Sequence, residues 1–568
     1  MASTTTRWRP SCGGRGQSPV AACIQRTLRQ VLHRSPGEPR STRPGPAAGG
    51  CTNAPTRRCA SGGLAALSLI RRRISRRRFL EASGLGVAGL AAGGAGFAVS
   101  QIVGPIGRSS GPRDGGDPPP PRYRSRPDLN PPVVTMTKTG PTSPGYIFLT
   151  PGNGVGSLGP TIIDDTGEPI WMRPDSGQQA TNLKVWDYGG KPVMAWWQGQ
   201  ITVGYGHGTY VLMDQGYQQI AEVHAQNGYF GDLHEFVLTP RGTGLMSIFG
   251  VATGQVLTTR GPGLGNIVEG VVQEVDVASG RLLFEWRSSQ HVATQESYLD
   301  IPRDPRTPYD YFHINSIDEA DDGDLLVSAR HTWCVYKIHR PSGDVEWRLG
   351  GKRSDFEMGK GTRFAWQHDA RYHADGSISI FDDGAHGPPP QFETESRAIL
   401  LRADATTGKA SLERAYSHPG ILSSSEGSVQ ELPDGHTFVG WGDVPHFTEW
   451  GQTGRWVLDG QYPAEGSYRS YRFPWTGRPL EPPDVAVVPN WGGTHTVYAS
   501  WNGATDVDAW RLMAGPSTDQ LTMVDSSPRG GFETAMVTRT TEPWVAVQAV
   551  DAQGSVMGIS KPASVART

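Results

Sequence analysis

Residues 313–347 read HINSIDEADDGDLLVSARHTWCVYKIHRPSGDVEW, and this stretch holds one complete copy of the pattern that decides the fold. It contains two tight turns, Asp322-Gly323-Asp324 and Pro341-Ser342-Gly343, and a short apolar run follows each of them. Gly turns between runs of β-branched and aromatic residues are typical of β-hairpins. One copy of the pattern therefore predicts two hairpins, which is four strands.

The second kind of turn in this stretch recurs along the chain, each time before a strand that often ends in an aromatic residue. Its six copies are Asp165-Thr166-Gly167, Asp214-Gln215-Gly216, Ala278-Ser279-Gly280, Pro341-Ser342-Gly343, Thr406-Thr407-Gly408 and Gln452-Thr453-Gly454. Their glycines are 49, 64, 63, 65 and 46 residues apart. A regular period of this length indicates a repeat architecture.

The first kind of turn lies between these copies and also precedes an apolar strand. Its copies are Gly189-Gly190-Lys191, Arg241-Gly242-Thr243, Asp322-Gly323-Asp324, Asp375-Gly376-Ser377 and Asp434-Gly435-His436. Two hairpins per unit make a four-stranded blade, and about 40–50 residues per blade is normal for propellers. We therefore predict an all-β protein with a six-bladed β-propeller over residues 129–480. A β-sandwich is the structural alternative, although it requires no repeat near this length.

The last part of the chain has a different pattern. Residues 497–501 and 544–551 alternate between apolar and polar as strands do, and Pro482-Pro483 precedes them. Residues 481–568 are similar to a small fibronectin type III sandwich, which we expect to be an accessory module.

The beginning of the chain is basic and predicts export. Residues 1–80 hold sixteen Arg and a single acid, Glu38. The run Ser75-Arg76-Arg77-Arg78-Phe79-Leu80 matches the twin-arginine pattern, and a weakly apolar stretch up to Ser100 follows it. We therefore expect a disordered basic extension at 1–74, a Tat signal at 75–100 and a Pro-rich linker at 101–128. The protein is then secreted or associated with the cell envelope, and an uncleaved N-terminal anchor remains open.

Charge and cysteine content exclude several function classes. The whole chain carries −2, so the residues after the basic head carry −17. An acidic body argues against nucleic acid as a partner, because phosphate binding needs clustered Lys and Arg. Four of the five Cys lie in the head, and Cys334 alone lies in the body, where an apolar strand predicts simple packing. The glycine-rich stretches lack the spacing of a phosphate loop, so no nucleotide cofactor is expected.

Three histidines occupy nearly the same place in the repeat. His234 and His368 each precede the Gly of the first kind of turn by eight residues, and His313 precedes it by ten. In a propeller the innermost strands surround one channel, so these side chains should meet there. The other histidines His224, His339, His418, His436 and His495 fit surface or strand-end positions more simply.

Arg330 follows an apolar strand and should lie near these histidines. A guanidinium among apolar residues needs an anion for its five donors. Three interpretations of the cluster stay open: polar residues that fill a narrow channel, a zinc or copper site, and covalent chemistry at a histidine on an anionic substrate. The absence of closely spaced histidine pairs weakens the metal interpretation.

Three segments resemble the signature segments of the PAPS-independent arylsulfate sulfotransferase family. They are Tyr311-Phe312-His313-Ile314-Asn315-Ser316-Ile317, Leu326-Val327-Ser328-Ala329-Arg330-His331 and Trp366-Gln367-His368-Asp369-Ala370. The resemblance covers about residues 129–480. It implies an exported six-bladed propeller that transfers a sulfuryl group from an aryl sulfate donor to a phenolic acceptor through a sulfohistidine.

The resemblance also assigns roles to residues. It implies that His368 is the nucleophile and that His313 and Arg330 bind the sulfuryl oxygens. His234 matches the remaining channel histidine, and no metal is implied. The best-studied branch of the family has a disulfide and an N-terminal sandwich, whereas this chain has one Cys in its body and its expected sandwich at the C-terminus. The oligomeric state therefore stays open. A secreted binding propeller and a metal-dependent hydrolase remain the alternatives.

Overall fold

The computed structural model describes residues 122–152, 159–174, 177–202, 204–258, 261–304, 306–387, 391–463 and 465–565. Within these ranges the chain is almost wholly β-structure, and its helical elements are three 3₁₀ turns: η2 (Ser288–Gln290), η3 (Thr294–Glu296) and η4 (Arg330–Thr332). None of the described helices has the length and apolar character needed to span a membrane. The predicted basic extension, export signal and most of the linker lie before residue 122, outside the described residues.

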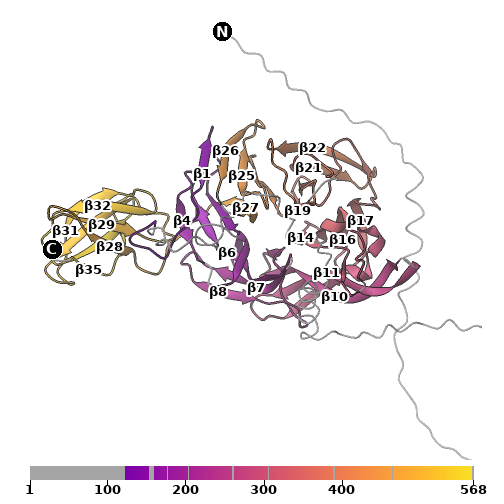
Figure 1. Ribbon diagram of the computed structural model, residues 1–568, viewed down its shortest axis with the longest axis horizontal. Helices are drawn as coiled ribbons and strands as arrows, with labels where there is room; N and C mark the ends of the chain where they lie inside the picture. The colour runs from indigo at the N-terminus through magenta and orange to yellow at the C-terminus, as the bar shows by residue number, and fades with distance from the viewer. Residues whose placement is uncertain are drawn as a thin grey trace, which may run out of the picture. The chain divides into compact units, whose positions relative to one another are not determined.

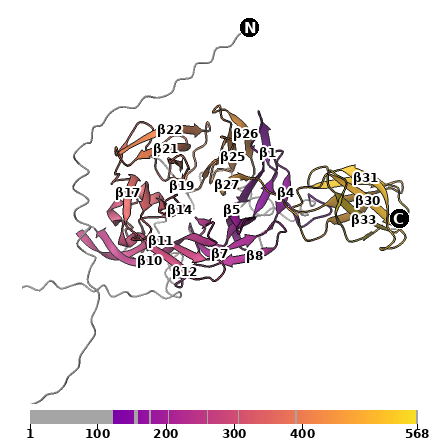
Figure 2. The same ribbon diagram turned by 180° about the vertical axis from the view of Figure 1, so that it is seen from behind.

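Six antiparallel sheets surround one axis as the blades of a propeller (Figures 1 and 2). Blade 1 consists of β27 (Ser467–Phe473), β2 (Tyr146–Pro151), β3 (Thr161–Ile163) and β4 (Pro169–Met172). Blade 2 consists of β5 (Gln179–Tyr188), β6 (Lys191–Thr202), β7 (Tyr205–Met213) and β8 (Gln219–Val223). Blade 3 consists of β9 (Phe236–Leu238), β10 (Thr243–Thr258), β11 (Gly261–Asp276) and β12 (Leu282–Arg287), with β13 (Tyr309–Asp310) paired to β11.

The remaining three blades follow in the same order from the axis outward. Blade 4 consists of β14 (Ile314–Glu319), β15 (Leu325–Ala329), β16 (Cys334–Ile338) and β17 (Val345–Gly350). Blade 5 consists of β19 (His368–Tyr372), β20 (Ser377–Asp382), β21 (Arg397–Asp404) and β22 (Lys409–Ser417), with β18 (Glu357–Met358) at its outer edge. Blade 6 consists of β23 (Ser428–Glu431), β24 (Thr437–Gly440), β25 (His446–Trp450) and β26 (Trp456–Gln461), with β1 (Thr135–Lys138) outermost.

The repeated turns of the sequence have one fixed place in each blade. All six copies of one kind join the third and fourth strands of a blade, and all five copies of the other kind join the first and second strands. In the turn between the third and fourth strands, five of the six glycines have φ between 65° and 83°, where a side chain is disfavoured. In blade 2 the positive φ falls on Tyr217 instead, at 60°. The six-bladed prediction is confirmed.

Blade 1 has no copy of the inner turn because its strands come from the two ends of the propeller sequence. Its inner strand β27 pairs with β2, so Tyr146 lies opposite Phe473. The strand β1 adds a second closing contact by pairing with β26, where Thr135 lies opposite Gln461. Closure on both sides leaves no open edge between the first and last blades.

The hydrophobic core is divided among the blade interfaces. Each pair of neighbouring blades shares one cluster of buried side chains. Phe312 and Tyr336 are fully buried between blades 3 and 4, for example, and Trp196 is buried between blades 1 and 2. Cys334 is a free, buried thiol within this packing, as the sequence predicted.

A buried charge network joins all six inner strands, one to three residues beyond the channel histidines. Glu235 accepts hydrogen bonds from Lys184 at 3.2 Å, from Arg469 at 2.9 Å and from Arg371. Asp369 binds Arg371 at 2.7 Å and the backbone N–H of Val429 in β23 at 3.0 Å. Arg469 also donates to the backbone carbonyl of Asn315 in β14 at 2.7 Å. We name this set the axial ion network.

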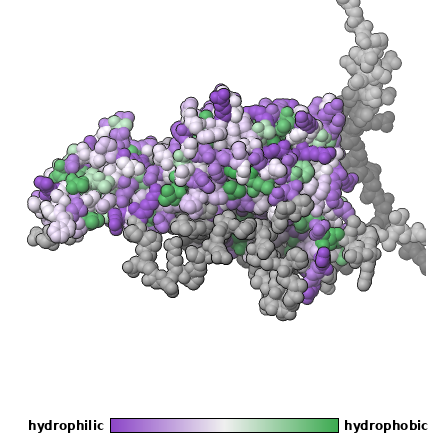
Figure 3. Space-filling model, turned by 45° about the horizontal axis from the view of Figure 1, so that its top comes forward, coloured by the Kyte–Doolittle hydropathy of each residue, from purple (hydrophilic) through white to green (hydrophobic). Residues whose placement is uncertain are grey.

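The last strands form two packed sheets with their own core around Trp510. One sheet contains β28 (Asp484–Pro489), β29 (His495–Ser500) and β32 (Glu533–Thr538). The other contains β31 (Thr522–Pro528), β30 (Ala509–Gly515), β33 (Trp544–Val550), β34 (Val556–Ile559) and β35 (Ala563–Ser564). The fibronectin type III likeness stays a prediction. On the surface drawn in Figure 3, hydrophilic and hydrophobic residues are interspersed.

Candidate active site

The three predicted histidines lie at the beginnings of three inner strands. His368 is the first residue of β19, His313 directly precedes β14, and His234 lies two residues before β9. The rings of His234 and His313 have centroids 5.0 Å apart. His234 and His368 both contact the ring of Tyr468 edge-on, at centroid distances of 5.5 Å and 6.4 Å. The structure therefore brings the three histidines together at the axis.

The backbone around these histidines takes a conformation that directs the side chains inward. His313 has φ 53° and Asp369 has φ 51°, both in the left-handed region that residues with a side chain seldom adopt. The pairing of β14 with β15 and of β19 with β20 shifts register at these same places. A bulge turns a side chain that the regular pleat would send elsewhere, and strained backbone of this kind collects at functional sites.

Two hydrogen bonds define the proton position on His368. The backbone N–H of Glu426 donates to Nε2 at 3.3 Å, so Nε2 carries a lone pair. Nδ1 therefore carries the proton and donates it to Asp383 at 2.8 Å. Burial lowers the pKa of His368 well below its usual value, and the charges of Arg330, His234 and His313 lower it further. His368 is thus a buried, neutral imidazole whose Nε2 carries no proton.

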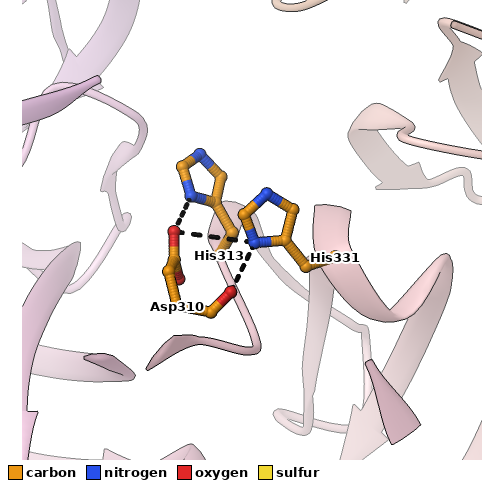
Figure 4. A group of neighbouring side chains, drawn as sticks. All are labelled: Asp310, His313 and His331. Atoms are coloured by element: carbon orange, nitrogen blue, oxygen red, sulfur yellow. Dashed lines mark hydrogen bonds and ion pairs between the residues drawn. The ribbon is translucent and has the colours of Figure 1, made fainter. Parts of the chain in front are cut away.

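The neighbouring histidines are also oriented through their Nδ1 atoms. Nδ1 of His313 lies 2.5 Å from an Asp310 carboxylate oxygen, and Nδ1 of His331 donates to the Asp310 backbone carbonyl at 2.6 Å. Figure 4 shows both rings with one nitrogen toward Asp310 and the other directed away from it. His234 contacts Asp232 in the same manner. An acid behind an imidazole fixes its orientation, so the opposite nitrogen is the one presented to a ligand.

Arg330 lies at the same place as a buried cation, and the charges of Asp383, Asp310 and Asp443 act on it without a direct ion pair. It begins η4, one residue after β15 ends, and its side chain reaches His331 at 3.3 Å, His386 at 2.9 Å and the backbone carbonyl of Ser424 at 2.7 Å. Its Nε is buried without a hydrogen-bond partner. In the described ranges no carboxylate lies within ion-pair distance of Arg330. A buried guanidinium with an unused donor is suited to bind an anion.

Aromatic side chains pack beside Arg330. The guanidinium lies over the ring of Trp366, 5.1 Å from its centroid. Trp366 stacks on His386 at 4.3 Å and contacts Trp333 edge-on at 5.3 Å. Tyr298 stacks on Trp333 at 3.8 Å. Both tryptophans are half-buried and have positive φ, 49° at Trp333 and 61° at Trp366, so this aromatic wall is held against backbone preference.

Sequence reasoning missed several residues of the site. His331 directly follows Arg330 in a segment already recognised, so its place could have been inferred from its neighbour. The acids Asp232 and Asp310 stand two and three residues before His234 and His313, which is a readable local pattern. His386 and Tyr468 carry no such signal, because one lies in a loop after β20 and the other at the beginning of β27. Trp441 is fully buried against Phe381 and is packing, not part of the site.

A metal ion is one further ligand that these side chains could hold. Ligand atoms of Asp310, His313 and His331 lie within 4.8 Å of one another. However, Nδ1 of His331 lies 2.6 Å from the Asp310 backbone carbonyl, which can only accept, so this nitrogen carries a proton and cannot bind an ion.

Comparison with solved structures finds chains of low identity. A protein of unknown function from Bacteroides caccae is 14% identical with a TM-score of 0.35, and the match covers 58% of this chain and 98% of that one. A streptogramin B lyase is 10% identical with a TM-score of 0.31, covering 65% and 94%. A virginiamycin B lyase from Staphylococcus aureus is 8% identical with a TM-score of 0.28, covering 58% and 93%. No curated protein matches the chain.

A family model gives the decisive comparison. The model described as arylsulfotransferase (ASST) matches residues 184–463. The match begins in β5 and ends after β26, so it spans blades 2 to 6 and includes His234, His313, Arg330 and His368. The chain belongs to the arylsulfotransferase family.

Proposed function

We propose that the protein is a PAPS-independent aryl sulfotransferase that moves a sulfuryl group from an aryl sulfate to a phenol through a sulfohistidine at His368. One observation carries the proposal: the buried guanidinium of Arg330 has no carboxylate partner in the described ranges and faces a group of imidazoles. A sulfate monoester would supply an anion that the guanidinium can bind directly. The family membership agrees with this substrate class.

The first half-reaction transfers the sulfuryl group to the protein. Nε2 of His368 attacks sulfur with its lone pair, and a nitrogen–sulfur bond forms as the sulfur–oxygen bond to the aryl group breaks. The electrons of that bond leave on the phenolate oxygen, which then takes a proton from water. Asp383 stabilises the positive imidazole during attack by accepting the Nδ1 hydrogen bond.

The second half-reaction returns His368 to its resting form. A phenol gives its proton to the hydroxide left by the first half-reaction, its oxygen attacks the sulfur, and the nitrogen–sulfur bond breaks with its electrons returning to Nε2. Splitting the transfer in this manner gives ping-pong kinetics. Arg330, His313 and His234 would hold the non-reacting oxygens, and each well-placed donor contributes about 3–4 kcal/mol to the transition state.

The aromatic wall suits the aryl groups of both substrates. Trp366 lies beside Arg330, so a ring bound against Trp366 places its sulfate at the guanidinium. Offset and edge-on contacts between aromatic rings are favourable and do not depend on the substituents of one phenol. This geometry supports acceptance of several simple phenols. Export through the Tat system also belongs to the proposal and rests on residues 75–80.

The test uses the purified full chain with 4-nitrophenyl sulfate as donor and phenol as acceptor. We expect release of 4-nitrophenol, formation of phenyl sulfate, and a sulfuryl adduct on the His368 peptide after a rapid quench without acceptor. His368→Ala should lower release by about a thousandfold or more, as for loss of a nucleophile. His224→Ala is the matched control because His224 is exposed and outside the channel.

Other outcomes distinguish the alternatives. Undiminished release in His368→Ala removes the sulfohistidine assignment. Inorganic sulfate as the product, lost after chelation, indicates a metal-dependent hydrolase. The absence of any release with several aryl sulfates indicates a binding propeller.

A further inference from the structure

A second histidine cluster lies away from the channel, between the outer parts of blades 5 and 6. His446 begins β25, Asp459 lies in β26, and His418 directly follows β22. The ring centroids of the two histidines are 4.8 Å apart. Their side chains are 25% exposed for His418, 11% for His446 and 21% for Asp459, so the cluster is held in place and still open to solvent. The proposed sulfotransferase chemistry uses none of these residues.

The ligand atoms have the spacing of a transition-metal site. Nε2 of His446 and Nε2 of His418 lie 2.8 Å and 3.5 Å from the same Asp459 oxygen, and one ligand atom from each residue lies within 4.8 Å of the others. Atoms bound to zinc at about 2.0–2.1 Å in a tetrahedron lie about 3.3 Å apart. Small side-chain adjustments therefore reach the required geometry.

The proton position on His418 is compatible with a cation bound at its other ring nitrogen. The Nδ1 of His418 lies 3.2 Å from the backbone carbonyl of Pro419, which can only accept, so Nδ1 carries the proton. Nε2 of His418 faces the same Asp459 oxygen at 3.5 Å, so either a proton or a metal ion between these two atoms can join them.

Hydrogen bonds from surrounding residues orient the Asp459 carboxylate, as is usual for a side chain that binds a metal ion. Thr448 donates its hydroxyl to the Asp459 oxygen at 2.8 Å, and the buried indole of Trp441 donates to Thr448 at 3.1 Å. Such hydrogen bonds fix ligating groups and commonly contribute tenfold or more to affinity.

We propose that His418, His446 and Asp459 bind a zinc ion, with solvent at the open fourth position. Two histidines and a carboxylate suit zinc, which accepts nitrogen and oxygen ligands in a tetrahedron. The ion would join the loop after β22 to blade 6. That loop continues to Ser424 and Glu426, whose backbones contact Arg330 and His368.

The test titrates the metal-free full chain with cobalt(II), which reports tetrahedral coordination by its visible absorption, and then displaces it with zinc. We expect one equivalent to bind and zinc to raise the melting temperature. His446→Gln and Asp459→Asn should abolish this binding at concentrations that saturate the unmodified chain. Thr448→Val keeps all three ligands and should weaken binding about 10–100-fold.

Two matched variants locate the ion. His313→Gln removes a member of the channel group, and His224→Gln removes an exposed histidine elsewhere; both should bind cobalt as the unmodified chain does. Loss of binding in His313→Gln with retention in His446→Gln would place the metal in the channel and overturn the proposal. Absence of any tetrahedral cobalt spectrum at millimolar metal would also overturn it. Neither result depends on sulfotransferase activity.

Discussion

At the scale of single residues, His368 is held in the form that its proposed chemistry needs. An imidazole attacks sulfur only when its nucleophilic nitrogen has no proton. Burial opposes charge on the ring, and the positive charge of Arg330 opposes it as well, so the pKa of His368 lies well below the usual histidine value. The neutral ring should therefore persist in acid solution where an exposed histidine is protonated.

This environment predicts an unusual pH profile for donor cleavage. In the unmodified chain, the rate constant for 4-nitrophenyl sulfate cleavage should not fall as the pH is lowered through about 6.5, where an ordinary histidine becomes protonated. Arg330→Gln removes a nearby positive charge, which makes protonation of His368 easier and raises its pKa. The acid limb of the profile should then move to higher pH, and kcat/KM should fall about 10²–10³-fold.

The measurement is kcat/KM across the acid range, normalised to its plateau. Arg306→Gln is the control because Arg306 is exposed on a loop. An acid limb that does not move in Arg330→Gln contradicts the charge coupling, even if activity falls.

The sequence predicted part of this site for a clear physical reason. Equivalent positions of a repeat must meet at the axis, so His234, His313 and His368 could be placed together without coordinates. Arg330 followed from its apolar strand. His386 could not be found because no local pattern marks it in the long connection between β20 and β21, and Tyr468 because closure of the ring brings it to the histidines from the far end of the sequence.

At the scale of elements, residues 366–369 at the beginning of β19 carry both the proposed nucleophile and part of the aromatic wall. Trp366 and Asp369 have positive φ on either side of His368. This pair of left-handed residues directs Trp366 toward Arg330 and Asp369 into the axial ion network, while His368 lies against Asp383. One short segment thus carries the residue proposed to contact the aryl ring, the proposed nucleophile and a member of the axial ion network.

If the aromatic wall contacts the aryl group of the donor, substitution of Trp366 should weaken donor binding. Trp366→Ala should lower kcat/KM for 4-nitrophenyl sulfate about tenfold, because the substrate loses an aromatic contact of about 0.5–1.5 kcal/mol together with buried area. The effect should appear mainly in KM, and the sulfuryl adduct on His368 should still form.

A matched comparison uses Trp456→Ala. Trp456 is 39% exposed on the outer strand β26 and should leave KM unchanged. Equal KM values for Trp366→Ala and the unmodified chain would exclude contact between Trp366 and the donor ring.

At the scale of the whole molecule, the axial ion network links all six blades at the centre of the ring. Glu235 is fully buried and is shared by three cations from blades 1, 2 and 5. Burial raises the pKa of Glu235, but Arg371, Arg469 and Lys184 lower it more strongly, to about 2. The turn pattern of the sequence predicted six blades, whereas this network depends on contacts across the axis that no local pattern encodes.

The network predicts a large stability effect at one position. Glu235→Gln keeps the shape of the side chain but leaves three buried cations with less negative charge. We expect a loss of about 3–5 kcal/mol in the free energy of unfolding, as for a broken buried ion pair. Urea titration followed by tryptophan fluorescence measures it, with the exposed Glu222→Gln as control. A change within about 0.5 kcal/mol would show that the network does not hold the ring together.

Blade 1 is built from strands at both ends of the propeller sequence, and this has a practical consequence for the design of shorter fragments. The family match stops at residue 463, before β27, and it starts at residue 184, after β2, β3 and β4. A fragment trimmed to those limits would keep all four proposed catalytic and anion-binding side chains yet lack the entire blade that seals the circle. Its two terminal blades would expose their apolar flanks to water, and Arg469 would be missing from the centre. Shortened versions of the protein should therefore be designed from strand pairing, beginning before Thr135 and ending after Phe473.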